Sequence, residues 1–207
     1  MTHDYIEYSN SIYTVSNLLS EERCAELIAL SEQMGYNSAP ITTERGFEIK
    51  QNIRNNTRVI LDSIELAEEF WSLVEPWVVS DWRTCKAVGL NERFRFYRYD
   101  SGQQFDWHRD GIYRRKNGQK SLFTVIFYLN ADFDGGLTEF RDLEIPIEAG
   151  SALFFWHSEL HRGSPVTAGR KYVLRTDVMY SPEPTFKTCQ VSDLPLSLYH
   201  GDRHAWS

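Results

Sequence analysis

Two side chains that commonly bind metal ions stand two residues apart in this chain, His108 and Asp110. In a β-strand, residues i and i+2 point to the same face, so the imidazole and the carboxylate can reach one ion. A third ligand must come from elsewhere in the chain. His161 is the best candidate because it follows the strand-like apolar run 152–156 by a few residues. A His-x-Asp pair alone is weak evidence, since any strand can carry one as a surface or core pair.

Two imidazoles and one carboxylate form the facial triad of non-haem iron(II) oxygenases, which leaves three coordination positions open. The sequence therefore predicts that His108, Asp110 and His161 are both metal ligands and catalytic residues.

The strand that leads to this pair has a period of two from residue 91 to 99. If Tyr99 faces inward, then Tyr97 and Arg95 do too, and Phe94 and Phe96 pack on the other face beneath a helix. A bulge between residues 94 and 99 would reverse the assignment.

The strand expected at 171–180 has the same period, and Arg175 and Asp177 share a face with Lys171. Arg95, Tyr97, Arg175 and Asp177 are thus candidate substrate-binding residues. A structural ion pair between Arg95 and Asp177 explains those two residues equally well.

Further strands are expected between residues 122 and 156, separated by glycine-rich turns. Thr124 and Tyr128 share one face of the strand 122–129, and polar groups inside such a strand usually have a partner. Short strands at 138–140 and 151–156 complete the pattern. Repeated short strands with such turns indicate a sandwich or a closed jelly roll.

Two amphipathic helices are expected before the strands. Ser20 is a plausible N-cap for a helix to about Met34, with an apolar stripe of Leu27, Leu30 and Met34. Asp62 and Glu65 form a capping signature for a second helix, which covers a sheet with Leu66, Phe70, Leu73, Val74 and Trp77. Residues 36–51 are expected to form a long loop that lies over a pocket.

Two polar stretches allow alternative interpretations. The run 54–58, Arg-Asn-Asn-Thr-Arg, could bind substrate, but such a run is more often a solvated turn. The basic residues 114–116 are either a solvated hairpin tip or a lid that attracts an acidic group.

Composition narrows the class of protein. With 207 residues, 42% of them hydrophobic, the chain can form one domain over 1–207: a helical part to about 87, a strand-rich core at about 88–181 and a tail at 182–207. Three separated cysteines favour a reducing cytoplasm over a disulfide framework or a thiolate zinc site. From its residues we expect neither a signal peptide nor a membrane span. A net charge of −7 disfavours nucleic-acid binding.

The spacing of many residues resembles that of the prolyl 4-hydroxylase-like branch of the 2-oxoglutarate and iron(II)-dependent dioxygenases. The resemblance covers residues 88–180 and, weakly, 50–80. It rests on Tyr99, Gly102, His108-Arg109-Asp110, Thr124, Tyr128-Leu129-Asn130, Gly135-Gly136, Thr138, Phe140, Pro146, Gly150 and the segment from His161 to Lys171.

This resemblance implies a mainly β fold, a double-stranded β-helix (jelly-roll, cupin-like) core packed against N-terminal helices. It implies Fe(II), 2-oxoglutarate and O2 as cofactor and cosubstrates, and it allows ascorbate as a reductant. Lys171 would pair with the distal carboxylate of 2-oxoglutarate, with Tyr99, Tyr128 and Thr124 as further cosubstrate-binding residues. Succinate and CO2 would be released as an unactivated C–H bond is hydroxylated.

The substrate stays open. Collagen-type prolyl hydroxylases carry a tyrosine three residues before the first His, and here Phe105 stands at that position without a hydroxyl group. Peptidyl proline, another side chain and a small molecule all remain candidates. Two other functions are also considered. One is a metal-binding jelly roll without turnover, which would act as a sensor or interaction module. The other is a nucleic-acid demethylase, which the net charge disfavours. The oligomeric state cannot be read from the sequence.

Overall fold

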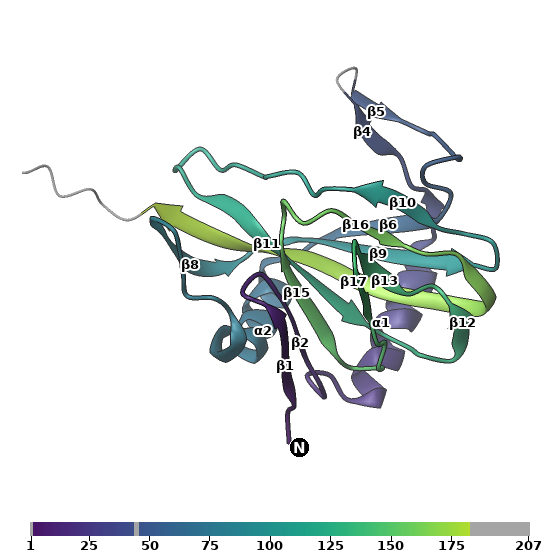
Figure 1. Cartoon of the computed structure of the whole chain (residues 1–207), viewed down its shortest axis with the longest axis horizontal. Helices are drawn as coiled ribbons and strands as arrows, with labels where there is room; N and C mark the ends of the chain where they lie inside the picture. Colours follow the sequence, from purple (N-terminus) through teal and green to yellow (C-terminus); the bar gives the residue numbers. More distant parts are fainter. Residues whose placement is uncertain (1, 44–45, 183–207) are drawn as a thin grey trace, which may run out of the picture.

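The computed structural model describes residues 2–43 and 46–182. The chain folds around one large antiparallel sheet and a smaller one that faces it (Figure 1). In the large sheet the main strand order is β1 (Tyr5–Ser9), β2 (Ile12–Val15), β15 (Ala152–Trp156), β11 (Lys120–Tyr128), β17 (Val166–Pro182), β9 (Arg93–Asp100), β6 (Thr57–Asp62) and β3 (Asn37–Ser38).

The smaller sheet has the order β10 (Phe105–His108), β16 (His161–Gly163), β13 (Thr138–Phe140) and β14 (Leu143–Ile145). Strand β12 (Phe133–Gly135) pairs with β17. So does β8 (Cys85–Leu90), which also pairs with β7 (Asp81–Trp82). Two facing antiparallel sheets make the expected jelly-roll core, and the prediction of a mainly β fold is confirmed.

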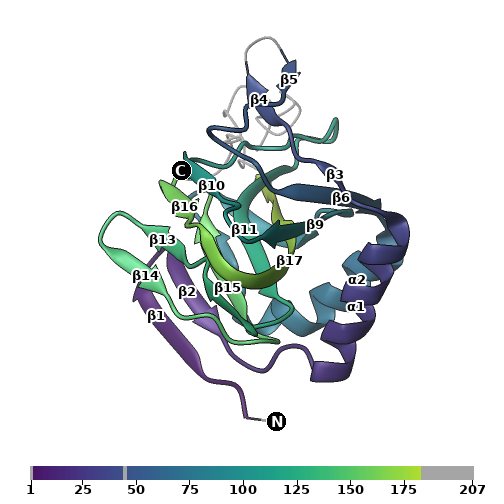
Figure 2. The same ribbon diagram turned by 90° about the vertical axis from the view of Figure 1, so that its right-hand side faces the viewer.

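Two helices cover the outer face of the large sheet (Figure 2). Helix α1 runs over Glu21–Met34 and α2 over Ile64–Val74, followed by the short 3-10 helix η1 (Glu75–Trp77). Arg23 of α1 forms an ion pair with Glu69 of α2 at 2.9 Å, which links the two helices. Among the residues in the described parts of the chain, no helix is long and apolar enough to cross a membrane.

The period of two in β9 sorts its side chains as expected. Phe94 and Phe96 are fully buried in the core beneath the helices, where the Phe70 ring meets Phe94 edge to face. Tyr97 and Tyr99 lie in the second core, between the two sheets. The register from Arg93 to Asp100 shows no bulge against β6 or β17, so the predicted inward face of Arg95, Tyr97 and Tyr99 is confirmed.

Two expectations about the N-terminal helices need correction. Ser20 caps α1 as predicted, but the buried face is formed by Cys24, Leu27 and Ser31, and Leu30 and Met34 are exposed. The second helix begins one residue later than predicted because Ser63, not Asp62, is its N-cap. Asp62 is the last residue of β6 and forms an ion pair with Arg93.

The stretch expected to be a long loop contains strands. β3 joins the large sheet, and β4 (Ile41–Thr43) pairs with β5 (Gly46–Glu48) in a separate hairpin. After this hairpin the chain pairs with the strand that carries the first metal ligand: Arg54 forms a bridge with Phe105, and Asp106 N donates to Ile53 O. The expected C-terminal tail, 182–207, lies outside the described residues except for Pro182, the last residue of β17.

Candidate active site

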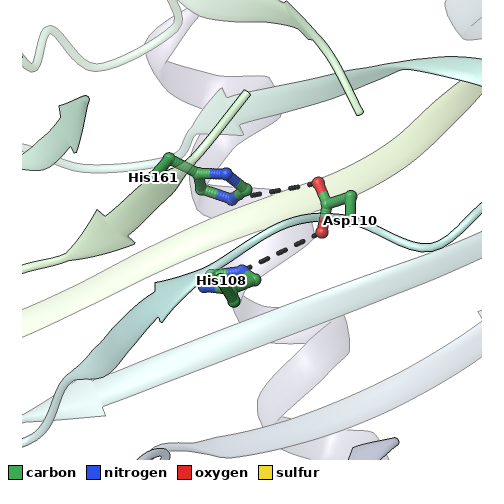
Figure 3. A group of neighbouring side chains, drawn as sticks. All are labelled: His108, Asp110 and His161. Atoms are coloured by element: carbon green, nitrogen blue, oxygen red, sulfur yellow. Dashed lines mark ion pairs between the residues drawn. The ribbon is translucent and has the colours of Figure 1, made fainter. Parts of the chain in front are cut away.

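The three predicted metal ligands point toward one another (Figure 3). One ligand atom from each of His108, Asp110 and His161 lies within 4.8 Å of the others. Asp110 Oδ1 is 3.9 Å from His108 Nε2, and Asp110 Oδ2 is 3.9 Å from His161 Nε2. The predicted convergence is therefore present in the structure.

Backbone pairing positions these three side chains. His108 ends β10 and His161 begins β16, and the two residues face each other across the antiparallel pair. Asp110 lies just beyond β10, where its backbone N–H donates to His157 O at 3.0 Å. The carboxylate thus lies on the side that the strand pleat predicted. It is held there by this hydrogen bond and not by pairing within a strand.

Both imidazoles present Nε2 to the centre of the site. The Nδ1 atoms of His108 and His161 lie 2.8 and 3.0 Å from the backbone oxygens of Asp106 and Glu159, two residues earlier in each case. A carbonyl that accepts from Nδ1–H fixes the tautomer in which Nε2 has its lone pair free for a metal.

The protonation states also suit a metal. Burial lowers the pKa of His108 to about 3, and burial also lowers the pKa of His161. Burial of Asp110 would raise the pKa of its carboxyl group, but the Arg175 guanidinium and the nearby imidazoles outweigh it and hold that pKa well below its usual range. Two neutral imidazoles and one carboxylate at neutral pH are the ligand set of a facial-triad iron(II) site.

A layer of polar side chains holds the carboxylate of Asp110. Thr124 Oγ1 donates to Asp110 Oδ2 at 2.5 Å, and Arg175 Nη1 lies 2.9 Å from Asp110 Oδ1. Thr124 is in turn 2.9 Å from His157 Nδ1, and His157 Nε2 is 3.0 Å from Ser121 Oγ. Thr124, predicted to bind cosubstrate, thus contacts a metal ligand in the absence of cosubstrate.

His157 is a site residue that the sequence reasoning missed. Its side chain is 1% exposed, and burial lowers its pKa. The available signal was a histidine directly after an apolar strand and four residues before His161. Only the fold shows that it supports Thr124 and, through its backbone oxygen, Asp110.

Lys171 lies in the same cavity as the triad. Its side chain is buried, and Nζ donates to Gly136 O at 2.6 Å. Tyr99 and Tyr128 flank it, with ring centroids 5.6 and 5.4 Å from Nζ. Burial lowers its pKa to about 7. No carboxylate pairs with Lys171 within the described residues, so this buried ammonium group can accept an anionic ligand.

One cavity joins the triad to this lysine. Its space, including the open mouth, is about 430 Å³. It is lined by Tyr97, Tyr99, Phe105, His108, Asp110, Ile126, Thr138, His161, Gly163, Lys171, Val173 and Arg175. Tyr128, predicted to bind cosubstrate, lies behind this wall and donates from its hydroxyl to Thr138 Oγ1 at 2.8 Å.

Of the four predicted substrate-binding residues, Tyr97 and Arg175 line the cavity, whereas Arg95 and Asp177 lie on the same sheet face outside its lining. The expected ion pair between Arg95 and Asp177 is present but long, at 3.5 Å. Arg175 contacts Asp177 more closely, at 3.0 Å. Asp177 is therefore a structural ion-pair partner, mainly of Arg175, and its pairing with Arg95 is weak.

The structure distinguishes between the interpretations of the two polar stretches, 54–58 and 114–116. Arg54 and Asn56 are buried, so the run 54–58 is not a solvated turn. The Arg54 guanidinium carbon lies 4.2 Å from the centre of the Phe105 ring, and that ring stacks on His108 at 3.5 Å. In the basic loop, Arg115 forms an ion pair with Glu92, and none of residues 114–116 lines the cavity.

Comparison with known proteins agrees with this geometry. The model of the 2OG-Fe(II) oxygenase superfamily matches residues 94–176. The probable prolyl 4-hydroxylase 3 of Arabidopsis thaliana is 22% identical over 202 residues, covering 82% of this chain and 69% of its own length.

Two solved structures have similar folds. The viral collagen prolyl hydroxylase of Paramecium Bursaria Chlorella virus-1, in complex with 2-oxoglutarate, matches with a TM-score of 0.63 and 21% identity, covering 84% of this chain and 97% of that one. A prolyl hydroxylase of Trichoplax adhaerens, in complex with a peptide fragment of a hypoxia inducible factor, matches with a TM-score of 0.63 and 17% identity, covering 82% and 84%.

Fold and site together define an iron(II) oxygenase of the jelly-roll type. The chain belongs to the 2OG-Fe(II) oxygenase superfamily, and within it the chain is a prolyl 4-hydroxylase-like dioxygenase.

Proposed function

We propose that this dioxygenase hydroxylates an unactivated C–H bond of a peptide or of a small molecule, with Fe(II) held by His108, Asp110 and His161. The observation that carries the proposal is the position of Lys171, a buried cation that shares one cavity with the triad. When bound, iron supplies the activation of O2 that is coupled to decarboxylation of 2-oxoglutarate to succinate.

In this proposal Lys171 binds the distal carboxylate of 2-oxoglutarate. Lys171 lines the cavity together with Thr138 and Tyr99, and a buried carboxylate needs such a charge partner and further hydrogen bonds. Tyr128 supports the site indirectly, since its hydroxyl donates to Thr138.

The protein's own residues also prepare the triad for turnover. A hydrogen bond from Thr124 and an ion pair with Arg175 leave Asp110 little freedom to rotate. The Phe105 ring stacks on one face of His108, with the ring centroids 3.5 Å apart. A peptide substrate is supported by the prolyl hydroxylases among the relatives, one of them solved with a peptide. Phe105 leaves small molecules equally open.

The test is release of succinate from 2-oxoglutarate by the Fe(II)-loaded protein, with prolyl peptides and free amino acids as candidate substrates. Asp110→Ala should abolish both metal binding and succinate release. Asp142→Ala removes an exposed carboxylate elsewhere and serves as the matched control. Binding of metal and 2-oxoglutarate without succinate release under any condition would favour a sensor module instead.

A further inference from the structure

Four arginines surround the Tyr97 side chain on the inner face of the large sheet: Arg54, Arg58, Arg95 and Arg175. Arg58 stands directly opposite Tyr97 in the β6–β9 pair, and Arg95 stands opposite Arg175 in the β9–β17 pair. The Arg54 guanidinium carbon is 4.5 Å from the Tyr97 ring centre. We call these four side chains the arginine cluster.

The carboxylates around the arginine cluster are too few for its charge. In the described residues, only Asp110 and Asp177 pair with it, and Arg175 contacts both, at 2.9 and 3.0 Å. Arg95 has a single contact of 3.5 Å with Asp177. Four guanidinium groups therefore share two carboxylates.

Three members of the cluster have unused hydrogen-bond donors, and one of these donors is the buried Nε of Arg175. Arg54 is 5% exposed and donates from Nε to Asn56, but its buried Nη2 has no partner in the described parts of the chain. Arg58, half-buried, makes no ion pair or side-chain hydrogen bond within those parts. Buried donors in folded proteins normally have partners, so unused ones next to a cavity indicate a missing ligand.

The electrostatics of the neighbouring groups agree with a surplus of positive charge. Burial lowers the pKa of Arg58, and repulsion from Arg54 and Arg95 adds to the shift. Burial alone would raise the pKa of Tyr97, yet Arg54, Arg175 and Arg95 outweigh it and lower that pKa. Like charges at a partly buried site repel one another. Repulsion between Arg58 and its neighbours in the cluster therefore favours binding of an anion.

We propose that the arginine cluster and Tyr97 bind a carboxylate of the substrate, so that the enzyme acts on a molecule with a free acidic group. The inference rests on the proposed function, because it names the substrate class of the same site. Lys171 is four residues from Arg175 along β17, roughly 13 Å at the usual strand rise. The lysine can therefore hold the cosubstrate while the cluster holds a second anion.

The side chains beside the cluster suit a carboxylate. Two aromatic residues, Tyr97 and Phe105, line the cavity, and the centres of both rings lie within 4.5 Å of the Arg54 guanidinium carbon. Guanidinium groups bind a flat carboxylate through paired hydrogen bonds.

The inference can be tested without turnover. The full-length protein is loaded with Mn(II) in place of iron and saturated with 2-oxoglutarate, and N-acetylglycinate is added as a probe. Mn(II) at the triad shortens the proton relaxation times of a small molecule bound nearby. N-acetylglycinamide, in which an amide replaces the carboxylate, is the matched neutral probe, and inorganic phosphate is the alternative anion.

We expect relaxation enhancement for N-acetylglycinate and not for the amide. Arg58→Gln and Arg95→Gln should each weaken probe binding about tenfold or more, as expected for loss of one charge-assisted hydrogen bond. Arg98→Gln is the matched control, since Arg98 lies on β9 but faces outward and pairs with Glu32. Without ligand, Arg58→Gln should melt at the same temperature as the native protein or higher, because it relieves repulsion.

Three results would overturn the inference: no enhancement with any probe, equal enhancement with the acid and the amide, or enhancement with phosphate alone. Lower thermal stability of Arg58→Gln with unchanged probe binding would assign the arginine a structural role instead. The proposed function fails by a different result, the absence of succinate release, which the relaxation experiment does not measure.

Discussion

Arg175 Nη1 lies 2.9 Å from Oδ1 of Asp110, so the carboxylate of the metal triad is part of an ion pair with a side chain of the protein itself. Both side chains are largely buried, with 12% and 4% of their surfaces exposed. Thr124 binds the other oxygen of the carboxylate. The ligand is thus held in position before a metal arrives.

Arg175→Gln should destabilise the metal-free protein strongly. The change leaves Asp110 without its charge partner and weakens the pairing of Asp177, and breaking a buried pair costs about 3–5 kcal/mol. Adding Mn(II) should recover part of the loss, since the ion restores a positive charge beside Asp110. Thermal melting with and without Mn(II) measures both effects.

The control for that experiment is Arg93→Gln. It breaks an exposed ion pair with Asp62, which should cost about 1 kcal/mol or less. Equal destabilisation by the two variants, or no recovery of Arg175→Gln with Mn(II), would contradict the proposed role of Arg175.

Metal binding at pH 7 should release no protons. The pKa of His108 is about 3, that of His161 is also lowered, and Asp110 is ionised, so no ligand has a proton to lose. Lys171 lies in the same cavity with a pKa of about 7 and could itself exchange a proton, so the titration uses the Lys171→Met variant. Calorimetric titration of this variant with Mn(II) in two buffers of different ionisation enthalpy should give the same binding enthalpy. A difference corresponding to one proton would show that an imidazole is protonated in the metal-free protein.

Lys171→Met should weaken 2-oxoglutarate binding by about one to two orders of magnitude and spare the metal, because a hydrogen bond to a charged group contributes about 1.5–3 kcal/mol. Calorimetric titration with 2-oxoglutarate in the presence of Mn(II) measures the change. Lys120→Met, on β11 outside the cavity lining, is the matched control. Unchanged affinity in Lys171→Met would show that another residue holds the cosubstrate.

The same lysine predicts a pH dependence. Its pKa is about 7 in the folded protein without ligand and about 10.4 in an unfolded chain, so between these values the unfolded state binds more protons. Stability from this group is therefore present at high pH and is lost as pH falls toward 7. The difference in unfolding free energy between the native protein and Lys171→Met should rise from pH 7 to 9, by at most about 1.4 kcal/mol per pH unit.

Cosubstrate affinity should change in the opposite direction. The anchor must be an ammonium ion, so binding of 2-oxoglutarate should weaken as pH rises above about 7. An affinity that stays constant from pH 7 to 9 would contradict a lysine with this pKa.

Phe96→Ala should lower stability by about 3–5 kcal/mol, the usual cost of removing a buried aromatic ring. Phe96 is fully buried beneath the helices, on the face of β9 away from the cavity. Chemical denaturation measures the loss. At temperatures where the variant stays folded, its affinity for 2-oxoglutarate should match that of the native protein. A lower affinity would mean that the two faces of β9 are not independent.

The triad and the faces of β9 were predictable because both depend on local rules. Alternation along a strand assigns Tyr97 and Tyr99 to one face whatever the rest of the chain does, and no bulge interferes. His161 could be matched to His108 because the chemistry of a metal site limits the candidates. Asp110 shows the limit of the rule, since a bond to His157 outside the strand sets its position.

The other points at which the structure differs from the sequence-based predictions come from interactions between segments that are distant in the chain. Asp62 was expected to cap a helix, but its partner Arg93 keeps it in β6 and leaves the cap to Ser63. Arg54 follows a polar hairpin and looks solvated in sequence, yet pairing with β10 buries it against Phe105. His157 has no pattern of its own, because its partners Ser121 and Thr124 lie on another strand.

The turn at Gly135 and Gly136 links the cosubstrate site to the backbone. Both glycines have positive φ angles, 72° and 63°, and the carbonyl of Gly136 accepts the hydrogen bond from Lys171. A methyl group at position 136 would lie 2.8 Å from the Val166 side chain and 3.4 Å from Lys171 Cδ. A descendant of this chain could therefore lose catalysis by a single change in that turn while keeping every metal ligand and the lysine. In such a lineage, an intact triad would be a remnant of ancestry and would no longer mark an active enzyme.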